Sequence, residues 1–233
     1  MNLNRLNLRN IACCLIYSTF FTVISSCSES DEPESSLKLL CDDANHVHAV
    51  DLGLSVKWAC CNVGATAPEE SGGLYAWGET EEKSEYSRST YKWFSEEKDD
   101  FAKYCISNED DDIPIDTVLD PEDDAAHIKM GGKWRTPTRE EVDELINRCS
   151  WRWATYKGIK GYIVTGPNNN SIFLPANEDY NDWSDGAYWT SSLYNNSHAF
   201  GLFFFDGTNG DFDLFCDGED REAGYGVRAV CSE

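Results

Sequence analysis

Hydrophobic residues recur with helical spacing in one stretch of the chain, Gly131–Cys149. Four apolar residues fall at i, i+3, i+4 and i+7 and therefore share one helix face: Val142, Leu145, Ile146 and Cys149. Thr138 can cap this helix, and Glu141 three residues later can complete a capping box. In the alternative start, Thr136 is the cap and Pro137 takes the first turn. The pattern predicts one amphipathic helix on which a sheet packs.

Elsewhere, short apolar and aromatic runs separated by turn residues predict strands. The expected strands are Leu54–Trp58, Trp151–Thr155, Gly161–Thr165, Ser171–Pro175, Ala187–Ser191, Phe200–Phe205, Asp211–Phe215 and Gly226–Val230. Asp120–Ala126 predicts a second, short helix, because Asp120 is a favourable cap and Pro121 suits the first turn. These elements together predict an α+β fold.

The N-terminus has the pattern of a secretion signal. Arg5 and Arg9 precede the apolar run Ile11–Ile24, which is too short for a comfortable membrane span. The run ends in Ile24-Ser25-Ser26-Cys27, which looks like a bacterial lipobox with Cys27 as the lipidated residue. The alternative is an ordinary signal peptide followed by a chance cysteine.

These features divide the chain into a lipoprotein signal peptide (1–26), a flexible acidic tether (27–48) and one domain (49–233). The tether is polar and acidic and cannot bury a core. An acidic run directly after the lipidated cysteine resembles the surface-export signal of Bacteroidota lipoproteins. We therefore expect a lipid-anchored protein of the outer membrane that faces the cell exterior.

The net charge of the chain limits the classes of partner that it can bind. Residues 1–26 contain two Arg and no acidic residue, so the chain from Cys27 onward has 42 acidic and 17 basic residues, a formal charge of −25. Such a surface repels nucleic acid and anionic head groups. A neutral glycan, a cation or a basic protein remains as a partner, and the membrane is contacted through the lipid alone.

Seven cysteines follow Cys27: Cys41, Cys60, Cys61, Cys105, Cys149, Cys216 and Cys231. The number is odd, so at least one is unpaired within the chain. Disulfides are compatible with the compartment. The favoured pairings join Cys149 to Cys61 or to Cys231, which would tie the helix end to a terminal strand. The alternative is that these residues are reduced, small and buried.

Acidic residues dominate the stretch Glu81–Thr117, which includes Asp110-Asp111-Asp112. The run suggests cation binding, but its acids lack the alternate spacing that brings ligands to one ion, which favours a solvated variable loop. Within it, Asp116-Thr117-Val118 resembles the acceptor sequence of Bacteroidota O-glycosylation. Thr117 is therefore a candidate glycosylation site.

Several segments together resemble one known family. They are, in order, DLGLSVKWA, YAWGET, EDDAAH, GGKWRTPTREEVDELI, SIFLPA, YWTSS and GVRAV. They resemble the Fibrobacter succinogenes major paralogous domain, over about residues 49–231. That family is a branch of the C-type-lectin-like fold, and the resemblance implies two helices flanking a small, twisted, mostly antiparallel sheet with long loops. The family has no established biochemical activity.

The stretch Trp134–Glu141 is also similar to formylglycine-generating enzymes, which belong to the same broad fold. Those enzymes need a closely spaced pair of reactive cysteines, whereas Cys216 and Cys231 lie far apart. Their Gly-Asn-Val-x-Glu-Trp motif is absent as well. We therefore expect a protein that is not an enzyme.

In the C-type lectin fold, a loop carries calcium and sugar, and the matching stretch here is Ala176–Gly186. Its candidate ligand-binding residues are Asn177, Glu178, Asp179, Tyr180, Asn181, Asp182 and Trp183. Their oxygens suit calcium and their rings suit a sugar. The lectin signatures Glu-Pro-Asn and Trp-Asn-Asp are missing, so a merely polar loop is the alternative. We expect a non-catalytic domain that binds an extracellular glycan or protein; the competing hypothesis is adhesion or assembly without a small ligand.

Overall fold

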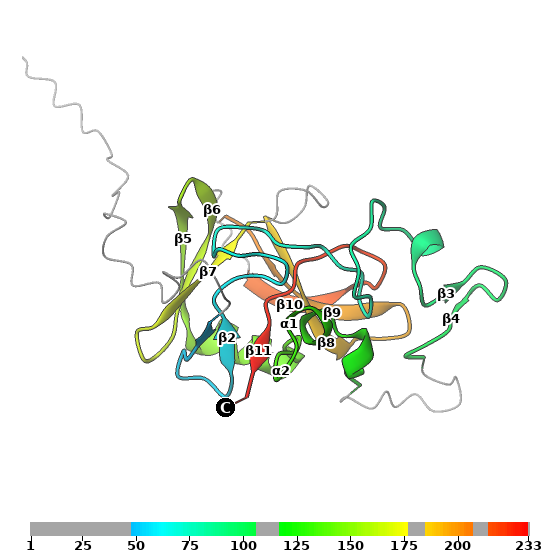
Figure 1. Cartoon of the computed structure of the whole chain (residues 1–233), viewed down its shortest axis with the longest axis horizontal. Helices are drawn as coiled ribbons and strands as arrows, with labels where there is room; N and C mark the ends of the chain where they lie inside the picture. The colour runs from blue at the N-terminus through cyan, green and yellow to red at the C-terminus, as the bar shows by residue number, and fades with distance from the viewer. Residues whose placement is uncertain (1–47, 106–116, 177–184, 207–213, 233) are drawn as a thin grey trace, which may run out of the picture. The chain divides into compact units, whose positions relative to one another are not determined.

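A computed structural model describes residues 48–105, 117–176, 185–206 and 214–232 of the chain (Figure 1). All of these residues belong to one compact unit, Glu34–Glu233. In these ranges the fold is mostly β, with four small antiparallel sheets. No helix within them is long and apolar enough to cross a membrane.

The first sheet joins the two ends of the domain. It contains β1 (Ala49–Val50), β2 (Lys57–Ala59) and β11 (Val230–Cys231), in the order β1-β2-β11. Trp58 is opposite Val50 on one side and Val230 on the other. The expected strand Leu54–Trp58 therefore overlaps the observed one only at its end. The last expected strand, Gly226–Val230, likewise meets β11 only at Val230.

Two further sheets have three strands each and contribute many of the buried side chains. One contains β5 (Ser150–Tyr156), β6 (Ile159–Thr165) and β7 (Ser171–Pro175), in chain order. The other contains β8 (Gly186–Leu193), β9 (His198–Phe204) and β10 (Leu214–Asp220), with β9 in the middle. The predicted strands that correspond to β5, β6, β8 and β9 are confirmed, and β7 matches to the residue, whereas the predicted strand Asp211–Phe215 shares only Leu214 and Phe215 with β10. Part of the predicted strand Asp211–Phe215 lies outside the described residues.

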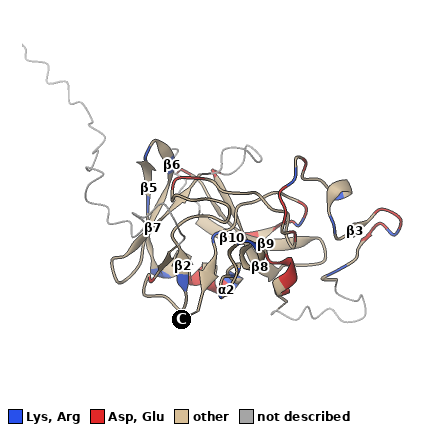
Figure 2. Ribbon diagram, in the orientation of Figure 1, with Lys and Arg blue, Asp and Glu red and all other residues tan. Residues whose placement is uncertain are grey.

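The smallest sheet is a two-stranded hairpin in the long segment before the helices. Its strands are β3 (Phe94–Ser95) and β4 (Asp100–Phe101), and a short 3-10 turn, η2 (Arg88–Thr90), precedes them. Figure 2 shows acidic residues, coloured red on the ribbon, along this part of the chain.

The predicted main helix is confirmed as α2 (Arg139–Arg148). Thr138 is its cap, and Glu141 completes the capping box, as the first of the two predicted starts requires. Val142 and Leu145 are buried, with Leu145 fully enclosed, while Ile146 and Cys149 pack at the edge of the core. The predicted apolar face is therefore the face that meets the sheets.

The expectation of two helices flanking a sheet is wrong. In the described part of the chain, α2 is the only helix of seven or more residues. The stretch predicted as a second helix begins as a 3-10 turn, η3 (Pro121–Asp123), and the helix α1 (Ala125–Met130) follows it. Asp124 separates the two because its backbone is extended and its carboxylate accepts hydrogen bonds from Ala126 and His127 as an N-cap. The fold is thus neither the expected α+β arrangement nor C-type-lectin-like in its helices.

The central sheet of β8, β9 and β10 separates two clusters of buried side chains. Tyr188, Leu202 and Phe204 belong to one cluster, which also contains Leu145 of α2. The alternate residues Trp189 and Phe203 belong to the other. The two-residue period of strands explains this division, because successive side chains point to opposite faces.

Candidate functional site

The predicted ligand-binding loop is described only at its ends. Asn177, Glu178, Asp179, Tyr180, Asn181, Asp182 and Trp183 lie outside the described residues. Before them, the Ala176 amide donates to Lys160 O at 2.9 Å. After them, the Asp185 amide donates to Phe204 O at 3.0 Å. The Asp185 carboxylate accepts from the Asp206 amide at 2.7 Å. Cys27 also lies outside the described residues.

The cysteines at the end of α2 and in β11 are thiols. Cys149 and Cys231 are both free in the structure, so neither pairing expected for Cys149, with Cys61 or with Cys231, is formed in it. Burial raises the pKa of Cys149 to about 11 and that of Cys216 to about 12. Both are therefore protonated at neutral pH and are poor nucleophiles.

The candidate O-glycosylation residue lies at the edge of the central sheet. Thr117 is half-buried, and its carbonyl accepts the Leu193 amide at 2.9 Å. Its neighbour Val118 is 40 % exposed and forms a bridge with Ser192. The structure thus places the candidate acceptor beside an exposed residue, and its glycosylation stays a prediction.

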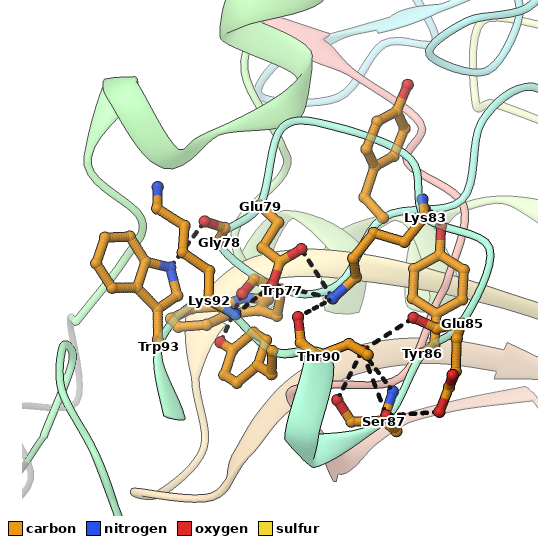
Figure 3. A network of polar contacts seen from close by, with 12 residues as sticks. Trp77, Gly78, Glu79, Lys83, Glu85, Tyr86, Ser87, Thr90, Lys92 and Trp93 are labelled. Carbon is orange, nitrogen blue, oxygen red and sulfur yellow. Dashed lines mark hydrogen bonds and ion pairs between the residues drawn. The ribbon is translucent and has the colours of Figure 1, made fainter. Parts of the chain in front are cut away.

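A network of polar contacts lies in Gly78–Cys105, called the aromatic segment below, which overlaps the predicted solvated loop Glu81–Thr117 (Figure 3). Glu79 is its centre and is only 7 % exposed. Its carboxylate pairs with Lys83 Nζ at 2.9 Å and accepts the Lys92 amide at 2.7 Å. Lys83 also donates to Thr90 O at 3.1 Å. These hydrogen bonds and the ion pair hold residues 79–92 around one buried carboxylate.

Aromatic side chains fasten the segment to the strand-like backbone that precedes it. Tyr86 donates its hydroxyl to Leu74 O at 2.5 Å, and Tyr91 donates to Trp77 O at 2.7 Å. Trp93 donates from its indole N–H to Gly78 O at 2.9 Å (Figure 3). Burial raises the pKa of Tyr91, which therefore stays neutral and keeps its donor.

Asp123 of η3 ties the far end of the segment to the domain. Its side chain is buried, and it accepts hydrogen bonds from Lys103 Nζ at 2.5 Å and Tyr104 Oη at 2.8 Å. Lys92 Nζ lies 3.4 Å away. Burial alone would raise the pKa of Asp123, but these hydrogen bonds and the nearby lysine charges outweigh it and lower the pKa. Asp123 is thus held as a carboxylate.

Arg221, which directly follows β10, also attaches the aromatic segment to the domain. Its side chain is fully buried, and its guanidinium donates to Tyr91 Oη at 3.1 Å, Asn196 O at 2.9 Å and Lys103 O at 3.0 Å. Four aromatic rings surround it at 4.8–5.8 Å, those of Phe101, Trp77, Tyr91 and Tyr104. Cation–π attraction and carbonyl acceptors together compensate for burying the charge.

The outer surface of the aromatic segment combines cations with aromatic rings. Lys92 is 53 % exposed and lies 4.1 Å from the centroid of Trp93. Arg88 is 48 % exposed, lies 5.3 Å from the centroid of Phe94 and pairs with Glu222 at 3.0 Å. Side chains of this kind bind ligands by stacking and by charge rather than by making covalent bonds.

Two ionisable side chains near the end of the aromatic segment have raised pKa values. Hydrogen bonds to Asp120 and Asp123 raise the pKa of Lys103, so it remains an ammonium ion. Burial raises the pKa of the Cys105 thiol. In the ranges that the structure covers, no group of three or more His, Cys, Asp or Glu is placed to hold a metal ion.

Comparison with family models, with curated proteins and with solved structures finds no match to this chain. The family resemblance thus rests on the residue patterns alone. Sequence reasoning missed the aromatic segment because it weighed the acids in the run and not the rings between them. Six aromatic residues within it signal burial: Tyr86, Tyr91, Trp93, Phe94, Phe101 and Tyr104.

Proposed function

We propose that this chain is a lipid-anchored protein of the bacterial outer membrane whose domain binds an extracellular glycan or protein without catalysis. The N-terminal sequence supports the anchor, through the Ile24–Cys27 lipobox pattern and the acidic stretch that follows. The high negative charge supports a neutral or basic partner.

The observation that carries the proposal is the aromatic segment. Its cations, Arg88 and Lys92, are exposed over the rings of Phe94 and Trp93, and a hydrogen bond to Gly78 O holds the Trp93 ring in place. Loops held on a rigid scaffold are where binding residues usually lie. A preorganised surface also loses little conformational entropy on binding. The loop Ala176–Gly186 remains a second proposed contact, with calcium as its candidate ion.

A glycan array provides the test. The mature chain from residue 27, with Cys27→Ser to prevent lipidation, is applied with calcium and with chelator. Lys92→Ala, which removes a cation stacked on Trp93, is compared with Lys98→Ala, which removes the same charge from an exposed position nearby. We expect Lys92→Ala to weaken binding more than Lys98→Ala does.

Other results would change the proposal. Loss of binding on chelation and in Trp183→Ala would place the ligand at the predicted calcium loop. An absence of binding to any glycan would overturn glycan recognition and favour the adhesion or assembly hypothesis. Turnover of a bound glycan would contradict a non-catalytic role.

A further inference from the structure

A second aromatic surface lies at the tip of the β8–β9 hairpin. In the sequence, this hairpin is distant from the aromatic segment. Tyr194 directly follows β8, and its side chain is among the most exposed large hydrophobic side chains, at 42 %. Its amide donates to His198 O at 3.0 Å, as does the Asn195 amide at 3.1 Å. Asn195 Oδ1 in turn accepts from the amides of Ser197 and His198, both at 2.9 Å. The turn that carries Tyr194 is therefore held by its own hydrogen bonds.

The ring of Tyr194 lies flat on the backbone of β10. A Cβ atom at Gly218 would come within 2.6–2.8 Å of three ring atoms, Cγ, Cδ1 and Cδ2. Only glycine allows so close an approach. The ring of Phe200 meets Tyr194 edge-on, with centroids 4.8 Å apart and planes at 75°. The Gly218 backbone thus covers one side of the Tyr194 ring, and the side chain as a whole remains 42 % exposed.

Polar side chains that both donate and accept hydrogen bonds adjoin these rings. His198 Nε2 lies 3.3 Å from Asp220 Oδ1, and the two side chains are 35 % and 54 % exposed. The Arg139 guanidinium lies 4.3 Å from the centroid of Phe200. It pairs with Asp143 at 3.5 Å, and both side chains are more than 40 % exposed.

We infer that Tyr194 is a stacking platform for a neutral sugar ring. A pyranose has a face of C–H groups that fits an aromatic ring, and its hydroxyls both donate and accept hydrogen bonds. The carboxylates of Asp143 and Asp220 accept from hydroxyls, and Arg139 and His198 donate to them. The net charge disfavours an acidic sugar. This inference rests on the proposed function and names a site and ligand class for it.

The test compares variants of the mature chain carrying Cys27→Ser. The strongest neutral oligosaccharide found on the array is titrated by calorimetry against wild type, Tyr194→Ala, Tyr194→Phe and Ile159→Ala. Ile159 is the matched control, because it is 40 % exposed on β6, outside the central sheet. We expect Tyr194→Ala to raise Kd about fivefold, because a stacked ring contributes roughly 1 kcal/mol, and we expect the other two variants to leave Kd nearly unchanged.

A second measurement does not depend on the folding of a variant. The sugar should shift the ring proton resonances of Tyr194 in the wild-type NMR spectrum, assigned by their absence in Tyr194→Phe. Unchanged Kd in Tyr194→Ala, equal weakening in Ile159→Ala, or unshifted Tyr194 resonances would each overturn the platform and leave the proposed function standing. An absence of glycan binding by the wild type would overturn both.

Discussion

At the scale of single residues, buried charged side chains in this protein are held in place because each has several hydrogen-bond or ion-pair partners. Asp123 is the clearest case, because a lysine, a tyrosine hydroxyl and a second lysine converge on one carboxylate. Such an arrangement favours the ionised form strongly enough to overcome desolvation. A carboxylate of this kind links folding to pH.

We predict that the unfolding free energy falls as the pH drops below about 4, the ordinary range of an aspartate pKa, and that Asp123 contributes to this fall. The pKa of Asp123 is lowered in the folded protein, so the unfolded chain binds the proton more readily. Its stabilising effect is therefore complete above the unfolded pKa and is lost as the pH falls through the folded pKa. Asp123→Asn should lower stability at pH 7 and flatten the acid-side decline in urea unfolding.

The control for this prediction is Asp217→Asn, which changes an exposed carboxylate on β10. It should leave both the stability at pH 7 and the shape of the pH profile close to wild type. An Asp123→Asn profile parallel to that of wild type down to pH 3 would contradict the linkage to Asp123. Other carboxylates with lowered pKa, such as Glu70 and Glu144, remain in both proteins and cancel in the comparison.

The sequence predicts those helices and strands whose determining residues lie close together in the chain. The helix α2 follows from Thr138, Glu141 and an apolar stripe within a few residues of one another. The strand β7 follows from the run SIFLP between turn residues. The aromatic segment was not predicted, because Arg221 contacts Tyr91 across 130 positions of sequence. No periodicity within the segment indicates that partner.

We predict that Arg221 is required for the order of the aromatic segment. Arg221→Met keeps an apolar side chain among the rings but removes the donors to the carbonyls of Lys103 and Asn196. Losing these hydrogen bonds from a charged donor should cost about 2–3 kcal/mol. Limited trypsin digestion should then cleave faster at Lys92, Lys98 and Lys103, because cleavage requires local opening.

Arg148→Met is the control, because Arg148 is 52 % exposed and pairs with Glu144 on the surface of α2. An exposed pair of this kind contributes little, so both stability and cleavage should stay near wild type. If Arg221→Met were cleaved no faster than Arg148→Met, Arg221 would not be required for the order of the segment.

At the scale of the whole molecule, the sequence predicts which residues form strands better than it predicts which strands pair. The pairing of β2 with β11 and the bridge of Tyr75 with Tyr225 join residues from opposite ends of the domain. The expected α+β class was wrong because the described chain is mostly β with one helix of seven or more residues, and the predicted short helix Asp120–Ala126 is interrupted at Asp124. Of the candidate sites, the loop Asn177–Trp183 stays a sequence prediction, whereas Tyr194 required the structure, because Gly218 lies on another strand.

The last prediction concerns how the molecule is held at the membrane. The run Ile11–Ile24 is shorter than the roughly 20 residues that a spanning helix needs, and Ile24-Ser25-Ser26-Cys27 has the lipobox pattern. We therefore predict that Cys27 is lipidated. Radiolabelled palmitate fed to expressing cells should label the wild type and Cys41→Ala, which keeps the lipobox and removes the next cysteine. Cys27→Ala should carry no label and should lose the lipid-dependent membrane attachment of the mature protein. Equal label in Cys27→Ala and wild type would show that no lipid is attached at this cysteine.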